Sequence, residues 1–119
     1  MSDNVHWLLE ISIKPGQLDT FKSVMTEMVA TIKENEPDTL NYEWFISEDQ
    51  QTYHIYERYV DSAANMIHLA TFGEKFAERV LATVEPTRFV VYGNPDETVR
   101  GALAGFGAVH MEEIGGFAR

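Results

Sequence analysis

The spacing of apolar residues alternates between the period of a strand and that of a helix, and this order constrains the fold more than any other feature. Alternation every second residue is typical of strands, and steps of three and four are typical of an amphipathic helix. The second helical pattern is interrupted at Thr71 and Gly73. The predicted strands cover 5–14, 39–46, 53–60 and 87–93, and the predicted helices cover 17–34, 62–70 and 74–84.

This β-α-β-β-α-β order is that of the ferredoxin-like, or split β-α-β, α+β fold. We expect one four-stranded antiparallel sheet with two helices on one face, formed by residues 1–93. Residues 94–119 are a C-terminal extension that packs on the same domain or on a dimer partner. In it, Asn94 and Pro95 begin a short helix over 94–107, and 108–119 form a fifth strand or an extended tail.

The sheet face away from the helices is expected to be apolar as well. Strand neighbours point to opposite faces, so the strand residues Leu8, Leu40, Phe45, Tyr53, Ile55 and Tyr59 cannot all point at the helices. A second apolar face needs a cover, and a second copy of the same sheet is the simplest one. We therefore expect a homodimer with the sheets face to face, in which the C-terminal tail reaches across the interface.

Composition excludes several classes of partner and chemistry. The net charge of −10 argues against nucleic acid and anionic membrane surfaces, and no apolar run is long enough to span a bilayer. There is no cysteine, which excludes thiolate nucleophiles and cysteine-bound metal. The first residues do not resemble a signal peptide, so we expect a cytoplasmic protein.

Aromatic side chains gather on the predicted sheet and second helix. Such a cluster is either ordinary core or the wall of a gap between sheet and helices, which would suit a flat aromatic ligand. The residues that would contact such a ligand are Trp7, Tyr42, Trp44, Tyr56, Phe72 and Phe76.

Two ionisable residues, His68 and Glu57, accompany this aromatic cluster on the predicted second helix and third strand. His68 has apolar helical neighbours, so it either closes the helix onto the sheet by a hydrogen bond or acts as a general base. Glu57 either orients His68 or pairs with a basic residue such as Arg58. Structural or surface roles are favoured for the remaining histidines, His6, His54 and His110. We predict no metal site, because the four histidines have no paired spacing, and no phosphate-binding loop.

A set of residues between Glu36 and Phe76 resembles the motif of the antibiotic biosynthesis monooxygenase (ABM) domain family. The resemblance covers about 5–92, and Asp38 stands where the family has glycine in its Glu-Pro-Gly strand entry. The matching residues are Glu36, Pro37, Tyr42, Glu57, Tyr59, Asp61, Ala64, His68 and Phe76.

The resemblance implies a dimeric α+β barrel that oxygenates quinols, anthrones or other phenols with dioxygen and without flavin, haem or metal. It implies His68 as the base, Glu57 as its support, and Tyr42 and Trp44 as walls or hydrogen-bond donors. Haem degradation is disfavoured because 72–80 contains no histidine. Two alternatives use the same pocket, namely a noncatalytic small-molecule-binding dimer and an isomerase or cyclase that needs no oxygen.

Overall fold

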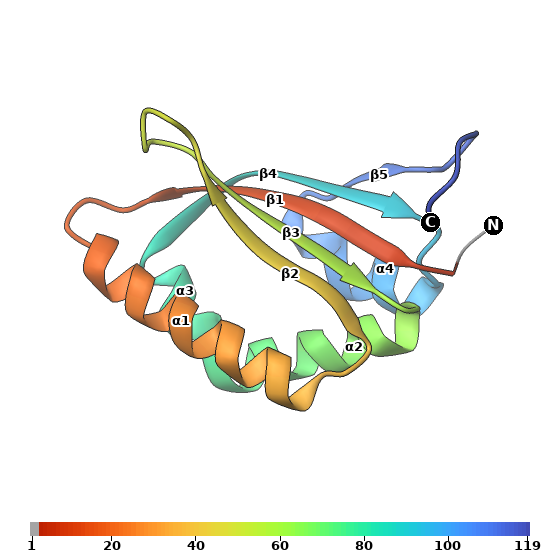
Figure 1. Ribbon diagram of the computed structural model, residues 1–119, viewed down its shortest axis with the longest axis horizontal. Helices are drawn as coiled ribbons and strands as arrows, with labels where there is room; N and C mark the ends of the chain where they lie inside the picture. The colour runs from red at the N-terminus through yellow and green to blue at the C-terminus, as the bar shows by residue number, and fades with distance from the viewer. Residues whose placement is uncertain (1–2) are drawn as a thin grey trace.

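The computed structural model describes residues 3–119 and contains the predicted β-α-β-β-α-β order, followed by a further helix and strand (Figure 1). The strands are β1 (Val5–Ile13), β2 (Thr39–Ile46), β3 (Tyr53–Tyr59), β4 (Val84–Gly93) and β5 (Val109–Met111). The helices are α1 (Leu18–Asn35), α2 (Ser62–Thr71), the π-helical turn η1 (Phe72–Phe76), α3 (Ala77–Leu81), α4 (Glu97–Leu103) and the 3₁₀ turn η2 (Ala104–Phe106).

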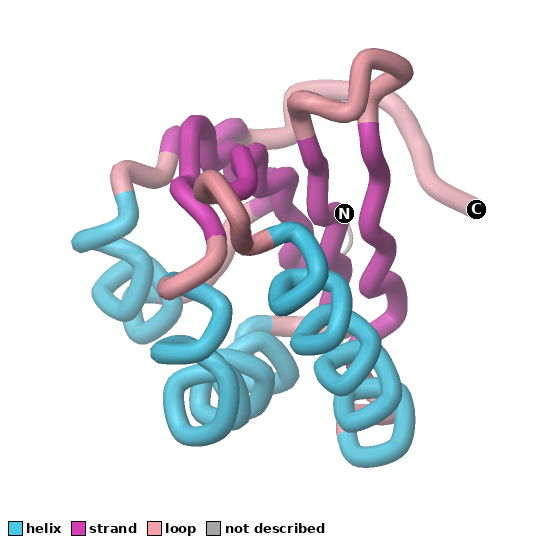
Figure 2. Tube along the Cα trace, turned by 90° about the vertical axis from the view of Figure 1, so that its left-hand side faces the viewer, coloured by secondary structure: helices cyan, strands magenta, loops and turns pink. Residues whose placement is uncertain are grey.

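The strands form one five-stranded sheet in the order β2-β3-β1-β4-β5. The first four pair antiparallel, as predicted, and β5 adds to β4 in parallel, which makes the sheet mixed. The helices lie together on one side of the sheet (Figure 2). The fold is therefore the expected α+β arrangement with an additional edge strand.

Helix α1 packs on the sheet through one apolar stripe. Its buried residues Phe21, Val24, Met28 and Ile32 follow helical steps of three and four. They join Ile11 and Ile55 of the central strands in one hydrophobic core cluster. Burial of this stripe fixes α1 across the sheet, and with it the position of the residue that follows the helix.

The predicted interruption of the second helix is a π-helical turn and not a loop. Asp61 caps α2 by accepting a hydrogen bond from the backbone N–H of Ala64. Helical backbone then continues through η1 into α3, with Phe72 at the start of the wider turn. Such turns insert one extra residue and are frequent at functional sites, because they re-aim neighbouring side chains.

Strand β4 begins earlier than predicted and includes Pro86, which we had placed before the strand. Proline lacks the N–H that a regular ladder needs, but it is tolerated at a bulge. Here the register between β1 and β4 shifts at Glu10 and Ile11, so that Ile11 pairs with Pro86. The register shift at this point accommodates Pro86, which has no N–H to donate to the ladder.

The C-terminal extension packs on its own protomer through α4. Asp96, and not the predicted Asn94, caps this helix by accepting a hydrogen bond from the N–H of Val99 at 2.9 Å. Val99 and Leu103 are buried in a second core cluster together with Trp7 of the central strand. The extension thus reaches the same sheet face as α2.

The outer face of the sheet is less apolar than expected. Tyr53, Ile55 and Tyr59 all lie in the core on the helix side. Polar pairs occupy much of the opposite face, including His54 with Glu10 at 3.0 Å. Exposed apolar side chains remain there as well, among them Phe45, Met111 and, in the tail, Ile114 and Phe117.

Candidate active site

A buried carboxylate lies in the middle of the helix-facing side of the sheet. Glu57 lies on the same face of β3 as Ile55 and Tyr59, and its partner across the ladder is Trp7. The indole Nε1 of Trp7 donates to Oε2 of Glu57 at 2.6 Å, and the Tyr59 hydroxyl donates to Oε1 at 2.6 Å. Strand alternation and register therefore hold Glu57 with only 5% of its surface exposed.

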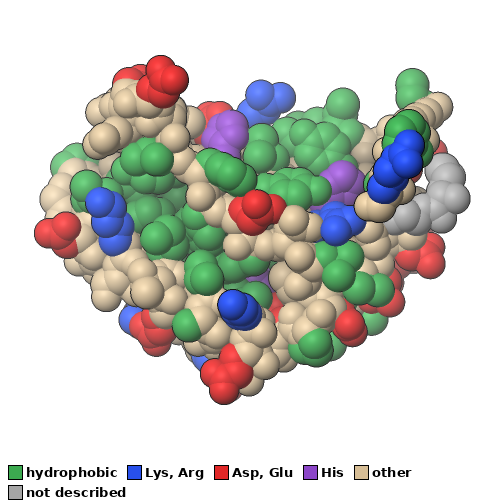
Figure 3. All heavy atoms as spheres, viewed as in Figure 1, with side chains coloured by type: hydrophobic (Ala, Val, Ile, Leu, Met, Phe, Trp, Pro, Cys, Tyr) green, Lys and Arg blue, Asp and Glu red, His purple; other side chains and the backbone are tan. Residues whose placement is uncertain are grey.

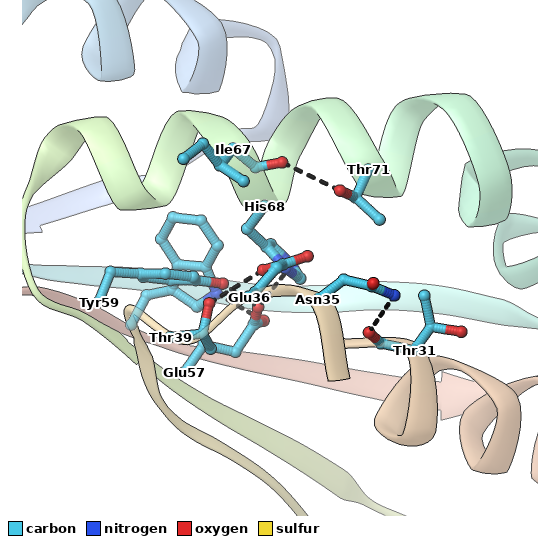
Figure 4. A network of polar contacts seen from close by, with 10 residues as sticks. Thr31, Asn35, Glu36, Thr39, Glu57, Tyr59, Ile67, His68 and Thr71 are labelled. Atoms are coloured by element: carbon cyan, nitrogen blue, oxygen red, sulfur yellow. Dashed lines mark hydrogen bonds and ion pairs between the residues drawn. The ribbon is translucent and has the colours of Figure 1, made fainter. Parts of the chain in front are cut away.

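His68 reaches this carboxylate from α2 and connects it to a second one. Its Nε2 lies 3.0 Å from Oε1 of Glu57, and its Nδ1 lies 3.1 Å from Oε1 of Glu36. Glu36 follows α1 and also accepts a hydrogen bond from the Thr39 hydroxyl at 2.9 Å. Figure 4 shows His68 pointing down from its helix between the two glutamates.

The two carboxylates keep the His68 ring charged. Burial by itself would lower the pKa of His68, but the hydrogen bonds and charges of Glu36 and Glu57 raise that pKa to about 9. Burial would likewise raise the pKa of Glu36, yet the bond to His68 lowers it below its ordinary value. At neutral pH His68 is an imidazolium with both ring nitrogens occupied, so it has no free lone pair to accept a proton.

The tyrosines around this centre stay neutral. Burial, followed by the charge of Glu57, raises the pKa of Tyr59 and of Tyr42 well above the ordinary value. Tyr59 therefore remains a hydroxyl that donates to Glu57. The ring of Tyr42 lies 5.6 Å from that of His68, centre to centre.

An apolar cavity of about 120 Å³ lies between the sheet and the helices, with this centre in its wall. Six of the predicted site residues line the cavity, namely Trp7, Tyr42, Trp44, Glu57, His68 and Phe72. Figure 3 shows hydrophobic side chains gathered between the β2–β3 turn and α1. Two predicted residues lie elsewhere: Tyr56 is on the outer face, with its hydroxyl 3.1 Å from Nδ1 of His6, and Phe76 is buried in the core.

Two polar groups in the cavity wall have hydrogen-bonding capacity to spare. The Nε1 of Trp44 is buried and has no partner among the described residues. Glu57 accepts from Trp7, Tyr59 and His68, and a carboxylate has about four acceptor positions, so one is open. The largely apolar cavity wall thus includes an unpaired donor at Trp44 and an acceptor with spare capacity at Glu57.

Sequence reasoning did not place several residues of this site, among them Glu36, Tyr59, Leu103 and Phe106. Glu36 and Tyr59 appeared only as parts of a family motif, and neither Leu103 nor Phe106 was considered, although both line the cavity. Glu36 precedes Glu57 by 21 positions, and only the packing of both helices on the sheet brings it to His68. The spacing of two between Glu57 and Tyr59 could have indicated that Tyr59 belongs to the site, since side chains two apart on a strand share a face.

Residues 3–119 contain no candidate metal centre and no candidate membrane span. No group of three or more histidine, aspartate or glutamate side chains is arranged to hold a metal ion. In the same part of the chain, no helix is long and apolar enough to cross a membrane.

Comparisons with known proteins agree with the architecture. The family model described as antibiotic biosynthesis monooxygenase matches residues 5–73, more than half of the chain. The structure of MupZ from Pseudomonas fluorescens aligns with a TM-score of 0.85 at 22% identity, covering 99% of this chain and 96% of that one. SnoaB from Streptomyces nogalater, described as a cofactor-independent oxygenase, aligns with a TM-score of 0.66 at 18% identity, covering 80% and 96%. No curated protein matches the chain.

Proposed function

This chain belongs to the antibiotic biosynthesis monooxygenase family, and we propose that it is a cofactor-independent monooxygenase of a small phenolic or quinol substrate. The observation that carries the proposal is the Glu57 carboxylate, which lies in the wall of an apolar cavity beside a charged imidazole. A carboxylate placed in this way can remove a proton from a substrate hydroxyl while water is excluded.

In this proposal Glu57, and not His68, is the general base. The open acceptor position of Glu57 receives the hydroxyl proton, because both nitrogens of His68 are already bonded to carboxylates. His68 remains an imidazolium beside the negative charge that passes to the substrate, and so stabilises it. The free N–H of Trp44 donates to a second substrate oxygen.

The protein need supply no redox group for the oxygenation of an electron-rich phenol. The phenolate gives one electron to dioxygen, and the resulting radical and superoxide combine into a carbon-bound peroxide. Loss of the ring hydrogen and cleavage of the O–O bond then give a carbonyl and water. Overall, a phenol and one dioxygen give a para-quinone and one water, and dioxygen is the oxidant.

The test is dioxygen consumption by metal-stripped protein with a panel of quinols and phenols. We expect uptake that requires the protein, with one water formed per dioxygen consumed and no peroxide released. Protein-dependent uptake that is abolished by a chelator or restored only by added metal would contradict the proposal. So would an absence of uptake with every compound that binds the cavity.

A second candidate is oxygen-independent proton transfer, as in an isomerase or cyclase. It is favoured by the charge state of His68, because Glu57 and His68 together form an acid–base pair at neutral pH. Anaerobic incubation in D₂O separates the two candidates. Exchange or isomerisation of a bound ketone without dioxygen supports this second function, and strict dependence on dioxygen supports the first.

We also propose that the chain acts as a homodimer through the outer face of its sheet. Phe45 and Met111 are about half exposed on this side, and Ile114 and Phe117 of the tail are almost fully exposed. Apolar groups gathered in this way are typical of an interface. Sedimentation equilibrium at micromolar concentration is expected to give twice the chain mass of 13.5 kDa, and a monomer would refute the proposal.

A further inference from the structure

Some of the residues that line the cavity are exposed to solvent and form its rim. Most of its lining residues are buried or half-buried, but Leu81 and Phe106 are 42% and 58% exposed, and Pro86 is also exposed. A side chain that lines the cavity and also faces solvent stands at its mouth. These three residues therefore mark the opening of the cavity.

The largest of the three rim side chains comes from the C-terminal extension. Phe106 ends η2, three residues after Leu103, which is only 2% exposed and lines the same cavity. Side chains three apart in a helical turn lie on one face, so the buried Leu103 anchors the position of Phe106. Gly107 then turns the chain away with a φ of +68°, a conformation that favours glycine. The matched family region ends at residue 73, so this part of the rim lies outside it.

The volume behind this rim is small. A cavity of about 150 Å³ lined by apolar side chains holds one benzene ring. The cavity here measures about 120 Å³, less than that benchmark, so it accommodates at most a single aromatic ring beside Glu57 and Trp44. A second fused ring has to occupy the mouth, where Phe106 stands.

We propose that Phe106 is the specificity-determining residue of this site and restricts it to single-ring phenols. The inference rests on the proposed function only for the choice of a phenolic ligand. It places the larger anthrones, with three fused rings, outside the substrate range of the native protein. Truncation of Phe106 opens the mouth without touching Glu57, His68 or Trp44.

The test is binding of phenol and of 1-naphthol, measured without oxygen by ligand-observed NMR, to three proteins. In the native protein we expect phenol to bind about tenfold more tightly than 1-naphthol, a typical size discrimination for a closed pocket. In Phe106→Ala the affinity for 1-naphthol is expected to rise by about tenfold and that for phenol to stay within about twofold. Ile67→Ala is the matched control, because Ile67 is 56% exposed, close to the exposure of Phe106, and does not line this cavity.

The proposal is overturned if Phe106→Ala leaves the ratio of the two affinities unchanged, or if Ile67→Ala shifts it equally. Failure of both probes to bind any of the three proteins also overturns it. Because Phe106 is largely exposed, its truncation is not expected to unfold the protein, and near-UV circular dichroism checks this. A shifted ratio without dioxygen uptake would retain this inference and reject the proposed oxygenase.

Discussion

Replacing Glu57 by glutamine is expected to lower the turnover number for dioxygen uptake by about 10²–10⁴-fold, the usual contribution of a general base. The amide keeps the size of the side chain and one acceptor oxygen for Trp7 or Tyr59, but it cannot take the substrate proton. Steady-state uptake of dioxygen, followed with an oxygen electrode at saturating substrate, measures the effect. Because proton removal precedes electron transfer in the proposed sequence, the loss should appear mainly in kcat.

The control for this variant is Glu48→Gln, which changes an exposed glutamate in the β2–β3 turn and should leave uptake unaffected. Circular dichroism and thermal unfolding establish whether Glu57→Gln is folded. A folded Glu57→Gln protein that keeps most of the native rate would show that another group is the base. The proposed role of Glu57 would then be abandoned.

The free energy of unfolding is expected to fall by roughly 2–3 kcal/mol as the pH rises from about 6 to about 9.5. The cause is His68, whose pKa is raised from 6.5 to about 9 in the folded protein. A histidine with a raised folded pKa contributes stability that is complete below 6.5, and this stability is lost as the pH passes through 9. Urea titrations at closely spaced pH values measure the decline.

Two variants test the assignment of this decline to His68. His54→Gln removes the other histidine–glutamate pair, His54 with Glu10, which is exposed enough for its loss to leave the alkaline slope unchanged. His68→Gln should remove the slope and lower stability at neutral pH by about 3–5 kcal/mol, because two buried carboxylates lose their counter-charge. A slope that survives in a folded His68→Gln protein would place its origin elsewhere.

If His68→Gln does not fold, Glu36→Gln gives the same information. This change removes one of the two carboxylates that raise the pKa of His68 and leaves Glu57 in place. The alkaline loss of stability is then expected to shift to lower pH. An unchanged midpoint would mean that Glu36 does not stabilise the imidazolium.

The order and the type of the elements were predictable because they depend on local periodicity. The steps from Phe21 to Ile32 and the alternation from Tyr53 to Tyr59 follow from helix and strand geometry alone. Departures from prediction occur where tertiary contacts decide the local structure. The bulge at Ile11 admits Pro86 into β4, and a π-helical turn replaces the expected break at Thr71 and Gly73.

The sequence by itself determined the order and type of the elements, because these depend on local periodicity, and it supplied the family motif and six residues of the cavity wall. Only the tertiary structure decided which group is free to accept a proton. Glu36 lies 32 positions before His68, and a contact of that separation leaves no trace in periodicity. Packing of both helices on the sheet brings the second carboxylate to the ring, which raises the pKa of His68 and leaves Glu57 with the open acceptor position. The same holds for Phe106, which reaches the mouth of the cavity only because the buried Leu103 anchors the extension against the sheet.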